Sequence, residues 1–164
     1  MNYLITEVPY GRHTHRLGTE PRLTYRMGDS GIIHGYSGNP LPCQPWFSEV
    51  EWFRNHFNRH LGVNINSALL NLYEDGRSYI SYHSDAETKP PRHMVIALSL
   101  GQSRRFYFRR KADKKVIKTT INDGDLMVMY GRCQELWHHS IPKQDTIEGR
   151  EMTPRLSITF RELV

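Results

Sequence analysis

Two segments of this chain carry residue types that bind transition metals. His83 and Asp85 stand two apart within segment 81–85, and a His-His pair occupies positions 138 and 139. Residues two apart on a β-strand point to the same face of a sheet, so His83 and Asp85 can hold one ion together. A histidine from a neighbouring strand would complete a 2-His-1-carboxylate triad, which is typical of non-haem Fe(II) sites with open coordination positions. Adjacent strand residues face opposite ways, so only one of His138 and His139 can join, and the spacing leaves both open.

The C-terminal segment 155–161 favours a metal site over a chance pairing among the nine histidines of the chain. Its alternation of polar and apolar residues predicts a half-buried strand with Arg155 and Arg161 on one face. Buried guanidinium groups need anions, and their planar forks match carboxylates at two points, so a dicarboxylate such as 2-oxoglutarate would satisfy both. Asn71 and Tyr73 share a face of an earlier strand and could add hydrogen-bond donors beside it. The alternative is a solvated edge strand whose arginines face water.

A basic, aromatic hairpin is predicted from the distribution of charge. The net charge of the chain is +5, and much of the excess lies in segment 104–118, where basic and aromatic side chains are interleaved. Arg105 and Arg109 fall on one face of its first strand, and Arg110 follows directly. Such a surface could contact nucleic-acid phosphates. By composition alone, a solvated hairpin whose charged edges prevent aggregation is the more common outcome.

The remaining pattern indicates a mainly β (α+β) chain of 164 residues that forms a single domain over 1–164. A helix is expected from Pro45 to Gly62, because proline favours the first turn of a helix and glycine follows the last. Eight strands then follow, separated by turn residues, an arrangement typical of a jelly roll. The expected strands span 63–73, 78–85, 94–100, 104–110, 115–121, 125–130, 135–140 and 155–161.

Composition also bears on the cellular setting. No apolar run approaches the length that spans a membrane, so no membrane partner is expected. The first residues have neither a basic region nor a long apolar run, which predicts no signal peptide. Cys43 and Cys133 are the only cysteines, which favours a reducing compartment, the cytoplasm or, in a eukaryote, the nucleus. We expect the chain to be a monomer.

Taken in order, the short motifs of this chain resemble those of AlkB-type oxygenases, which depend on Fe(II) and 2-oxoglutarate, from the branch that repairs alkylated nucleic-acid bases. The resemblance runs from Pro21 to the C terminus, and the joint occurrence of its pieces is highly specific. It implies a double-stranded β-helix, or jelly roll, over 63–164, with iron between its two sheets and a nucleotide-recognition lid over 21–46. The matching pieces are Pro21-Arg22-Leu23-Thr24, Asn71-Leu72-Tyr73, His83-Ser84-Asp85-Ala86-Glu87, Ser99-Leu100-Gly101, His139-Ser140-Ile141-Pro142 and segment 155–161 after Pro154.

The resemblance also implies roles for the residues of the metal and co-substrate site. It selects His139, because the family pattern is a histidine followed by a small residue and then an aliphatic-proline pair. His83, Asp85 and His139 would then be the catalytic iron ligands. The residues implied for 2-oxoglutarate are Arg155 and Tyr73 at its distal carboxylate, and Arg161 and Asn71 near its metal-bound end.

Substrate contacts are implied in the same way. The lid over 21–46 carries Tyr25, His34 and Tyr36 among glycines, and aromatic rings of this kind are expected to stack on an extracted base, with Tyr36 aligned with a stacking aromatic of the family. Glu87 is implied to lie near the base, where a carboxylate suits a cationic lesion. The resemblance also turns the basic hairpin into an expected phosphate contact through Arg105, Arg109 and Arg110.

The activity implied by the resemblance is oxidative demethylation of bases such as 1-methyladenine and 3-methylcytosine. Fe(II), O2 and 2-oxoglutarate are the implied cofactor and co-substrates, and formaldehyde, succinate and carbon dioxide the products. The expected partner is single-stranded or damaged nucleic acid, with DNA and RNA both open. The alternatives are an oxygenase that acts on a tRNA modification or a protein side chain, and a non-catalytic nucleic-acid-binding domain. The complete triad and both arginines argue against the last of these.

Overall fold

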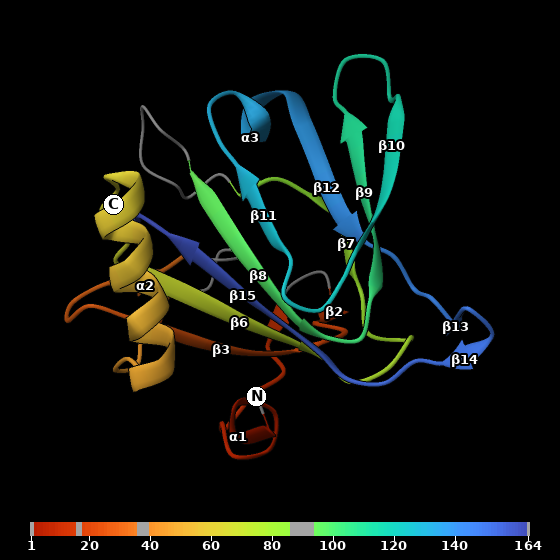
Figure 1. Cartoon of the computed structure of the whole chain (residues 1–164). Helices are drawn as coiled ribbons and strands as arrows, with labels where there is room; N and C mark the ends of the chain where they lie inside the picture. Colours follow the sequence, from red (N-terminus) through yellow and green to blue (C-terminus); the bar gives the residue numbers. More distant parts are fainter. Residues whose placement is uncertain (1, 16–17, 36–39, 86–93, 164) are drawn as a thin grey trace.

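The computed structural model describes the chain except residues 1, 16–17, 36–39, 86–93 and 164, and its main body is two antiparallel β-sheets (Figure 1). The large sheet contains, in spatial order, β11 (Leu126–Met129), β8 (Val95–Gly101), β15 (Arg155–Arg161), β6 (Ser67–Tyr73) and β3 (Leu23–Gly28). The small sheet contains β10 (Val116–Ile121), β9 (Arg104–Arg110), β12 (Trp137–Ile141) and β7 (Ile80–His83). Each of the eight expected strands is present, so the mainly β prediction is confirmed.

Short elements complete the described part of the chain. Three two-stranded ribbons pair β1 (Thr14–His15) with β2 (Gly18–Thr19), β4 (Ile33–His34) with β5 (Leu41–Pro42), and β13 (Thr146–Ile147) with β14 (Arg150–Glu151). The helices are α1 (Asn2–Thr6), α2 (Ser48–Leu61) and α3 (Cys133–Leu136). None of the helices that the structure describes is long and apolar enough to cross a lipid bilayer.

Strand β15 lies in the middle of the large sheet, hydrogen-bonded to β6 on one side and to β8 on the other. All seven of its residues are buried, because both faces are covered. Leu156, Ile158 and Phe160 pack into the main apolar core, where Phe160 meets Phe57 of α2 with ring centroids 5.3 Å apart. The opposite, polar face of β15 lines a cavity between the sheets. The predicted division of this strand into an apolar and a polar face is therefore confirmed.

Helix α2 is the flanking helix that the sequence predicts, and it covers the outer side of the large sheet (Figure 1). It begins at Ser48 rather than at Pro45, and it ends before Gly62, which has the left-handed conformation (φ 59°) that glycine adopts without strain. Val50 and Phe57 are its fully buried residues. The contact between the helix and β15 holds in place the strand whose other face lines the cavity.

The lid expected over 21–46 is corrected in part. Its segment 23–28 is β3, which pairs with β6 along its whole length and so belongs to the large sheet. Tyr25, one of the expected lid aromatics, stacks on Phe47 with ring centroids 5.6 Å apart. Leu23, Tyr25 and Met27 alternate with Thr24 and Arg26, so the segment has the period-two pattern of a strand, although the resemblance assigned it to the lid. The structure also describes residues 21–22, 29–35 and 40–46 of the expected lid, which lie outside β3.

Candidate metal and co-substrate site

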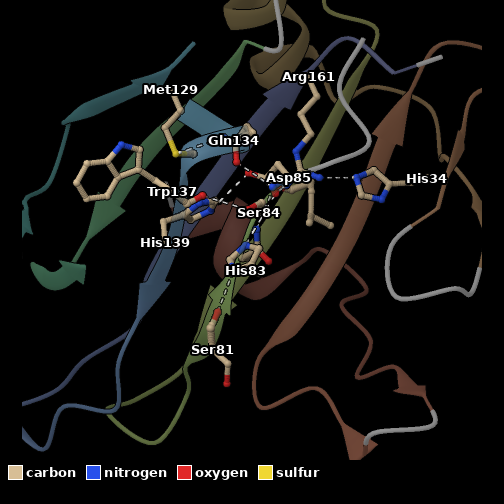
Figure 2. A network of polar contacts seen from close by, with 12 residues as sticks. His34, Ser81, His83, Ser84, Asp85, Met129, Gln134, Trp137, His139 and Arg161 are labelled. Carbon is tan, nitrogen blue, oxygen red and sulfur yellow. Dashed lines mark hydrogen bonds and ion pairs between the residues drawn. The ribbon is translucent and has the colours of Figure 1, made fainter. Parts of the chain in front are cut away.

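The three expected metal ligands come together at the end of β7 (Figure 2). His83 is the last residue of β7 and lies directly opposite His139 of β12 in the sheet register. Their Nε2 atoms lie 3.8 Å and 3.5 Å, respectively, from the carboxylate of Asp85. One ligand atom from each residue lies within 4.8 Å of the others, so these residues could hold one metal ion. His138 points to the other face of β12, opposite Arg109, and is not part of this group.

The electrostatics of the triad match the protonation states that metal binding requires. Burial by itself raises the pKa of Asp85, but the surrounding electrostatics, chiefly the charge of Arg161, outweigh burial and lower it below its usual value. Burial lowers the pKa of His139 to about 3 and also lowers the pKa of His83. Near neutral pH the site therefore offers a carboxylate and two neutral imidazoles, which are the forms that coordinate metals.

The orientation of His83 is fixed by the backbone. Its Nδ1 lies 2.8 Å from the carbonyl oxygen of Ser81, which can only accept, so Nδ1 carries the proton. The lone pair of Nε2 is then directed at the position between the three ligands. A ring nitrogen that donates to a backbone carbonyl is the usual means by which proteins fix the tautomer of a metal-binding histidine.

Arg155 provides a strong sign of an anionic ligand in the same cavity. Its side chain is buried, its Nε donates to Ser99 Oγ at 3.0 Å, and its Nη1 has no hydrogen-bond partner among the described residues. Burial lowers the pKa of Arg155 to about 10, so the guanidinium remains charged at neutral pH. A buried charged donor without a partner is unfavourable, and a ligand carboxylate would satisfy it.

Tyr73 lies beside Arg155, as expected, with its ring centroid 5.2 Å from the guanidinium carbon. Arg104 approaches the same ring to 5.4 Å. The sequence groups Arg104 with the basic hairpin, but the structure buries it and directs it at the backbone carbonyls of Asp75, Ser78 and Pro142. Its positive charge therefore adds to the cationic end of the cavity at Tyr73.

Asn71 lines the cavity, and its amide orientation is set by a residue to which the sequence assigned no role. Arg22, buried in front of β3, donates from Nε to Asn71 Oδ1 at 2.7 Å and lines the same cavity. Oδ1 is thus occupied, and Nδ2 donates weakly to the Leu69 carbonyl oxygen at 3.5 Å, so the second Nδ2 hydrogen is the donor that remains to meet a ligand. Arg22 belongs to the Pro21–Thr24 motif, and its place in that motif was the available signal for a role at the site.

Arg161 connects the metal triad to His34. Its Nη2 donates to Asp85 Oδ1 at 2.7 Å, and its Nη1 lies 3.2 Å from His34 Nε2. His34 is completely buried, so it is not available to stack on a substrate base, and this expected role is corrected. Burial, together with the charges of Arg161 and Arg26, lowers the pKa of His34 to about 3, so its neutral ring accepts a hydrogen bond from Arg161.

Three of the remaining residues expected to contact the substrate, Arg105, Arg109 and Arg110, lie on β9. On β9, Arg105 is exposed, and the guanidinium carbon of Arg109 lies 3.9 Å from the ring centroid of Tyr82. Arg110 forms an ion pair with Asp113 at 2.8 Å, which partly neutralises its charge. The structure thus places the three arginines on the hairpin and not in the cavity. Tyr36 and Glu87 lie outside the described residues.

Comparisons with known proteins agree with this geometry. A family model described as the 2OG-Fe(II) oxygenase superfamily matches residues 1–161. The DNA oxidative demethylase ALKBH2 of Bos taurus is 29% identical over 153 residues, which cover 88% of this chain and 54% of that protein. The alpha-ketoglutarate-dependent dioxygenase alkB homolog 3 of Homo sapiens is 31% identical over 153 residues, covering 87% of this chain and 51% of that protein. The chain spans about half the length of these curated relatives.

The fold has a counterpart among solved structures. The structure of OsALKBH1 matches with a TM-score of 0.61 and 20% sequence identity, covering 93% of this chain and 84% of that chain. This likeness supports the predicted jelly roll. Because the family model matches nearly the whole chain, this chain belongs to the 2OG-Fe(II) oxygenase superfamily, as an AlkB-type member.

Proposed function

We propose that this chain removes alkyl groups from nucleic-acid bases by oxidation, with Fe(II) as its metal and O2 and 2-oxoglutarate as co-substrates. The observation that carries the proposal is the shared cavity, which is lined both by the triad His83, Asp85 and His139 and by Arg155, whose buried Nη1 has no hydrogen-bond partner among the described residues. A metal and a dicarboxylate would satisfy the triad and Arg155 at once. The names of the relatives, a DNA oxidative demethylase and an alkB homologue, suggest the class of substrate.

The residues of the cavity fit Fe(II) and 2-oxoglutarate. His83, Asp85 and His139 would hold Fe(II), and Arg155 with Tyr73 would bind the distal carboxylate of 2-oxoglutarate. When bound, Fe(II) supplies the activation of O2, with 2-oxoglutarate as the source of electrons. Asn71 would donate to the end of 2-oxoglutarate that lies near the metal. At the same end of the cavity, Arg161 would hold the carboxylate of Asp85. These contacts place the co-substrate and exclude bulk water from the buried side of the cavity.

For the substrate we propose bases of the 1-methyladenine and 3-methylcytosine type, in single-stranded or damaged DNA or RNA. Alkylation at these positions leaves the base positively charged, which suits the carboxylate of Glu87. Tyr36 would stack on the extracted base, and Arg105, Arg109 and Arg110 would meet phosphates. Hydroxylation of the methyl carbon gives a hemiaminal on the base, which releases formaldehyde and leaves the normal base. We also propose that residues 1–164 act as one domain and as a monomer, in the cytoplasm or a nucleus.

The test is a turnover assay with purified protein, Fe(II), ascorbate, O2 and 2-oxoglutarate. Single-stranded DNA and RNA oligonucleotides carrying 1-methyladenine or 3-methylcytosine serve as substrates, and mass spectrometry and succinate assays follow the products. Loss of one CH2 unit from the oligonucleotide, with an equivalent of succinate, is expected for the native chain and not for Asp85→Ala. Succinate formed without demethylation would assign the oxygenase to another substrate, such as a tRNA modification or a protein side chain. Metal-loaded, folded protein that forms neither product would overturn the proposal.

A further inference from the structure

Asp85 lies past the end of the strand that should position it. β7 ends at His83, whose partner in the ladder is His139, so Asp85 is two residues beyond the last paired position. Its side chain is nevertheless 1% exposed and directed at the two histidines. A ligand outside a hydrogen-bonded ladder needs another means of fixing its backbone, because an unrestrained residue would lose conformational entropy each time it binds a metal.

Side chains replace the missing ladder at these two positions (Figure 2). Ser84 Oγ donates to the carbonyl oxygen of Trp137 at 3.0 Å. The backbone N–H of Asp85 donates to Gln134 Oε1 at 2.9 Å, across 49 positions of the sequence. The first of these bonds is exposed in part, whereas the second is buried. The bond from Asp85 to Gln134 is therefore the stronger candidate for fixing the metal ligand.

Gln134 is itself held from both sides. It lies in α3 and is only 6% exposed, and its Nε2 lies 3.5 Å from Met129 Sδ, which orients the amide with Oε1 toward Asp85. Lys111 fixes the helix from the hairpin side, because its Nζ donates to the Gln134 carbonyl at 2.8 Å and its N–H to the Leu136 carbonyl at 2.9 Å. A buried amide with its side chain and helix both anchored behaves as a preformed acceptor.

We infer that Gln134 is a positioning residue for the metal centre, whose side-chain oxygen holds the Asp85 backbone so that the carboxylate meets the ion. This inference rests on the metal site proposed above. Without this acceptor, the N–H of Asp85 loses its buried bond to Gln134 Oε1, and the Asp85 backbone is held less firmly in the conformation that binds metal. Binding a metal then requires restoring that conformation. The effect falls on metal affinity more than on the stability of the metal-free fold.

The experiment is a Mn(II) titration of the full chain, with free Mn(II) measured by electron paramagnetic resonance. Gln134→Met keeps the length of the side chain but removes the acceptor, and Gln134→Glu keeps an acceptor oxygen. Gln134→Met is expected to bind Mn(II) about 10- to 100-fold more weakly than the native chain, the usual range for losing a partner of a metal ligand. Gln134→Glu is expected to retain at least native affinity, since its added charge also attracts the ion. Equal affinities for Gln134→Met and the native chain would overturn the inference.

Gln144, between β12 and β13, provides a matched control. It is buried, and its Oε1 accepts from the backbone N–H of Arg105 at 3.0 Å, the same kind of bond outside the metal cavity. Gln144→Met is expected to lower the melting temperature and leave Mn(II) affinity unchanged. If Gln144→Met weakened Mn(II) binding as much as Gln134→Met, the role of Gln134 would be general packing and the inference would fail. If the native chain did not bind Mn(II), the metal site itself would be overturned, which is a different outcome.

Discussion

Arg161 and Asp85 form a buried ion pair, in which Nη2 donates to Oδ1 at 2.7 Å and the two side chains are 3% and 1% exposed. The pair joins the last residue of β15 in the large sheet to a proposed metal ligand that follows β7 in the small sheet. In the metal-free protein, Arg161 is the charged partner that keeps a buried carboxylate ionised. A bound metal would add a second positive charge on the opposite side of the carboxylate.

Arg161→Met should therefore destabilise the metal-free protein more than the metal-bound protein. Removing one partner of a buried pair leaves the other charge uncompensated, so the free energy of unfolding should fall by about 3 kcal/mol without metal. Saturating Mn(II) should recover part of this loss, because the ion compensates Asp85 directly. Urea unfolding of the variant and the native chain, each with and without Mn(II), measures both values. Equal losses in the two conditions would contradict this account of the pair.

Arg155→Met should remove the recognition of the distal carboxylate of 2-oxoglutarate. Loss of one partner from a buried, hydrogen-bonded charge pair costs about 3 kcal/mol, so 2-oxoglutarate should bind the Mn(II)-loaded variant roughly 100-fold more weakly. The ligand-free variant should lose little stability, because removing the buried Nη1, which has no partner, offsets the loss of the Nε bond to Ser99 Oγ. Titration calorimetry measures the affinity.

A 2-oxo acid without the distal carboxylate serves as the control ligand for Arg155. It should bind the native chain and Arg155→Met with the same affinity. A similar loss for both ligands would place Arg155 elsewhere than at the distal carboxylate.

His34 should make the stability of the fold depend on pH. Its pKa is about 3 in the folded protein against an ordinary value of 6.5, so the unfolded chain binds more protons between these values. The stability that neutral His34 contributes is therefore fully present above pH 6.5, and it is lost progressively as the pH falls from 6.5 toward 3. At about pH 5 the contribution lost is on the order of 2 kcal/mol.

His34→Gln isolates this contribution, because glutamine can still accept from Arg161 and does not titrate. The difference in unfolding free energy between the native chain and the variant should change with pH between these two pKa values and be constant above them. Urea unfolding at a series of pH values gives this difference. Parallel pH profiles would show that His34 does not titrate with a lowered pKa.

Arg105→Gln and Arg109→Gln should each weaken oligonucleotide binding, by similar factors for all sequences. If each arginine neutralises one phosphate, its loss should reduce the slope of log affinity against log salt by about 1. Fluorescence anisotropy of a single-stranded oligonucleotide at several salt concentrations measures the slope. Arg150→Gln is the control, since this side chain is 81% exposed in the separate β13–β14 ribbon and the variant has the same net charge as each hairpin variant. An unchanged slope for both hairpin variants would rule out phosphate contacts there.

The local patterns of the sequence were sufficient for α2 and for every strand of the two main sheets except β3. Segment 155–161 was predicted with the bounds it has, because its alternation is regular and both of its faces have a clear chemical character. The strand expected over 135–140 starts at Trp137, since the residues before it form α3. β3 was not assigned as a strand, because the resemblance placed segment 21–46 in the lid, although Leu23, Tyr25 and Met27 alternate with polar residues.

For the site, the sequence by itself determined which residue types could meet a metal and a dicarboxylate, since His-x-Asp spacing and an Arg-bearing strand are local features. Tertiary structure decided which residues meet. The register of β12 against β7 places His139, and not His138, opposite His83, and burial turns His34 toward Arg161. Gln134 reaches Asp85 across 49 positions. These choices depend on strand register and on the burial of polar groups, which are set by packing between distant segments, so no local spacing contains them.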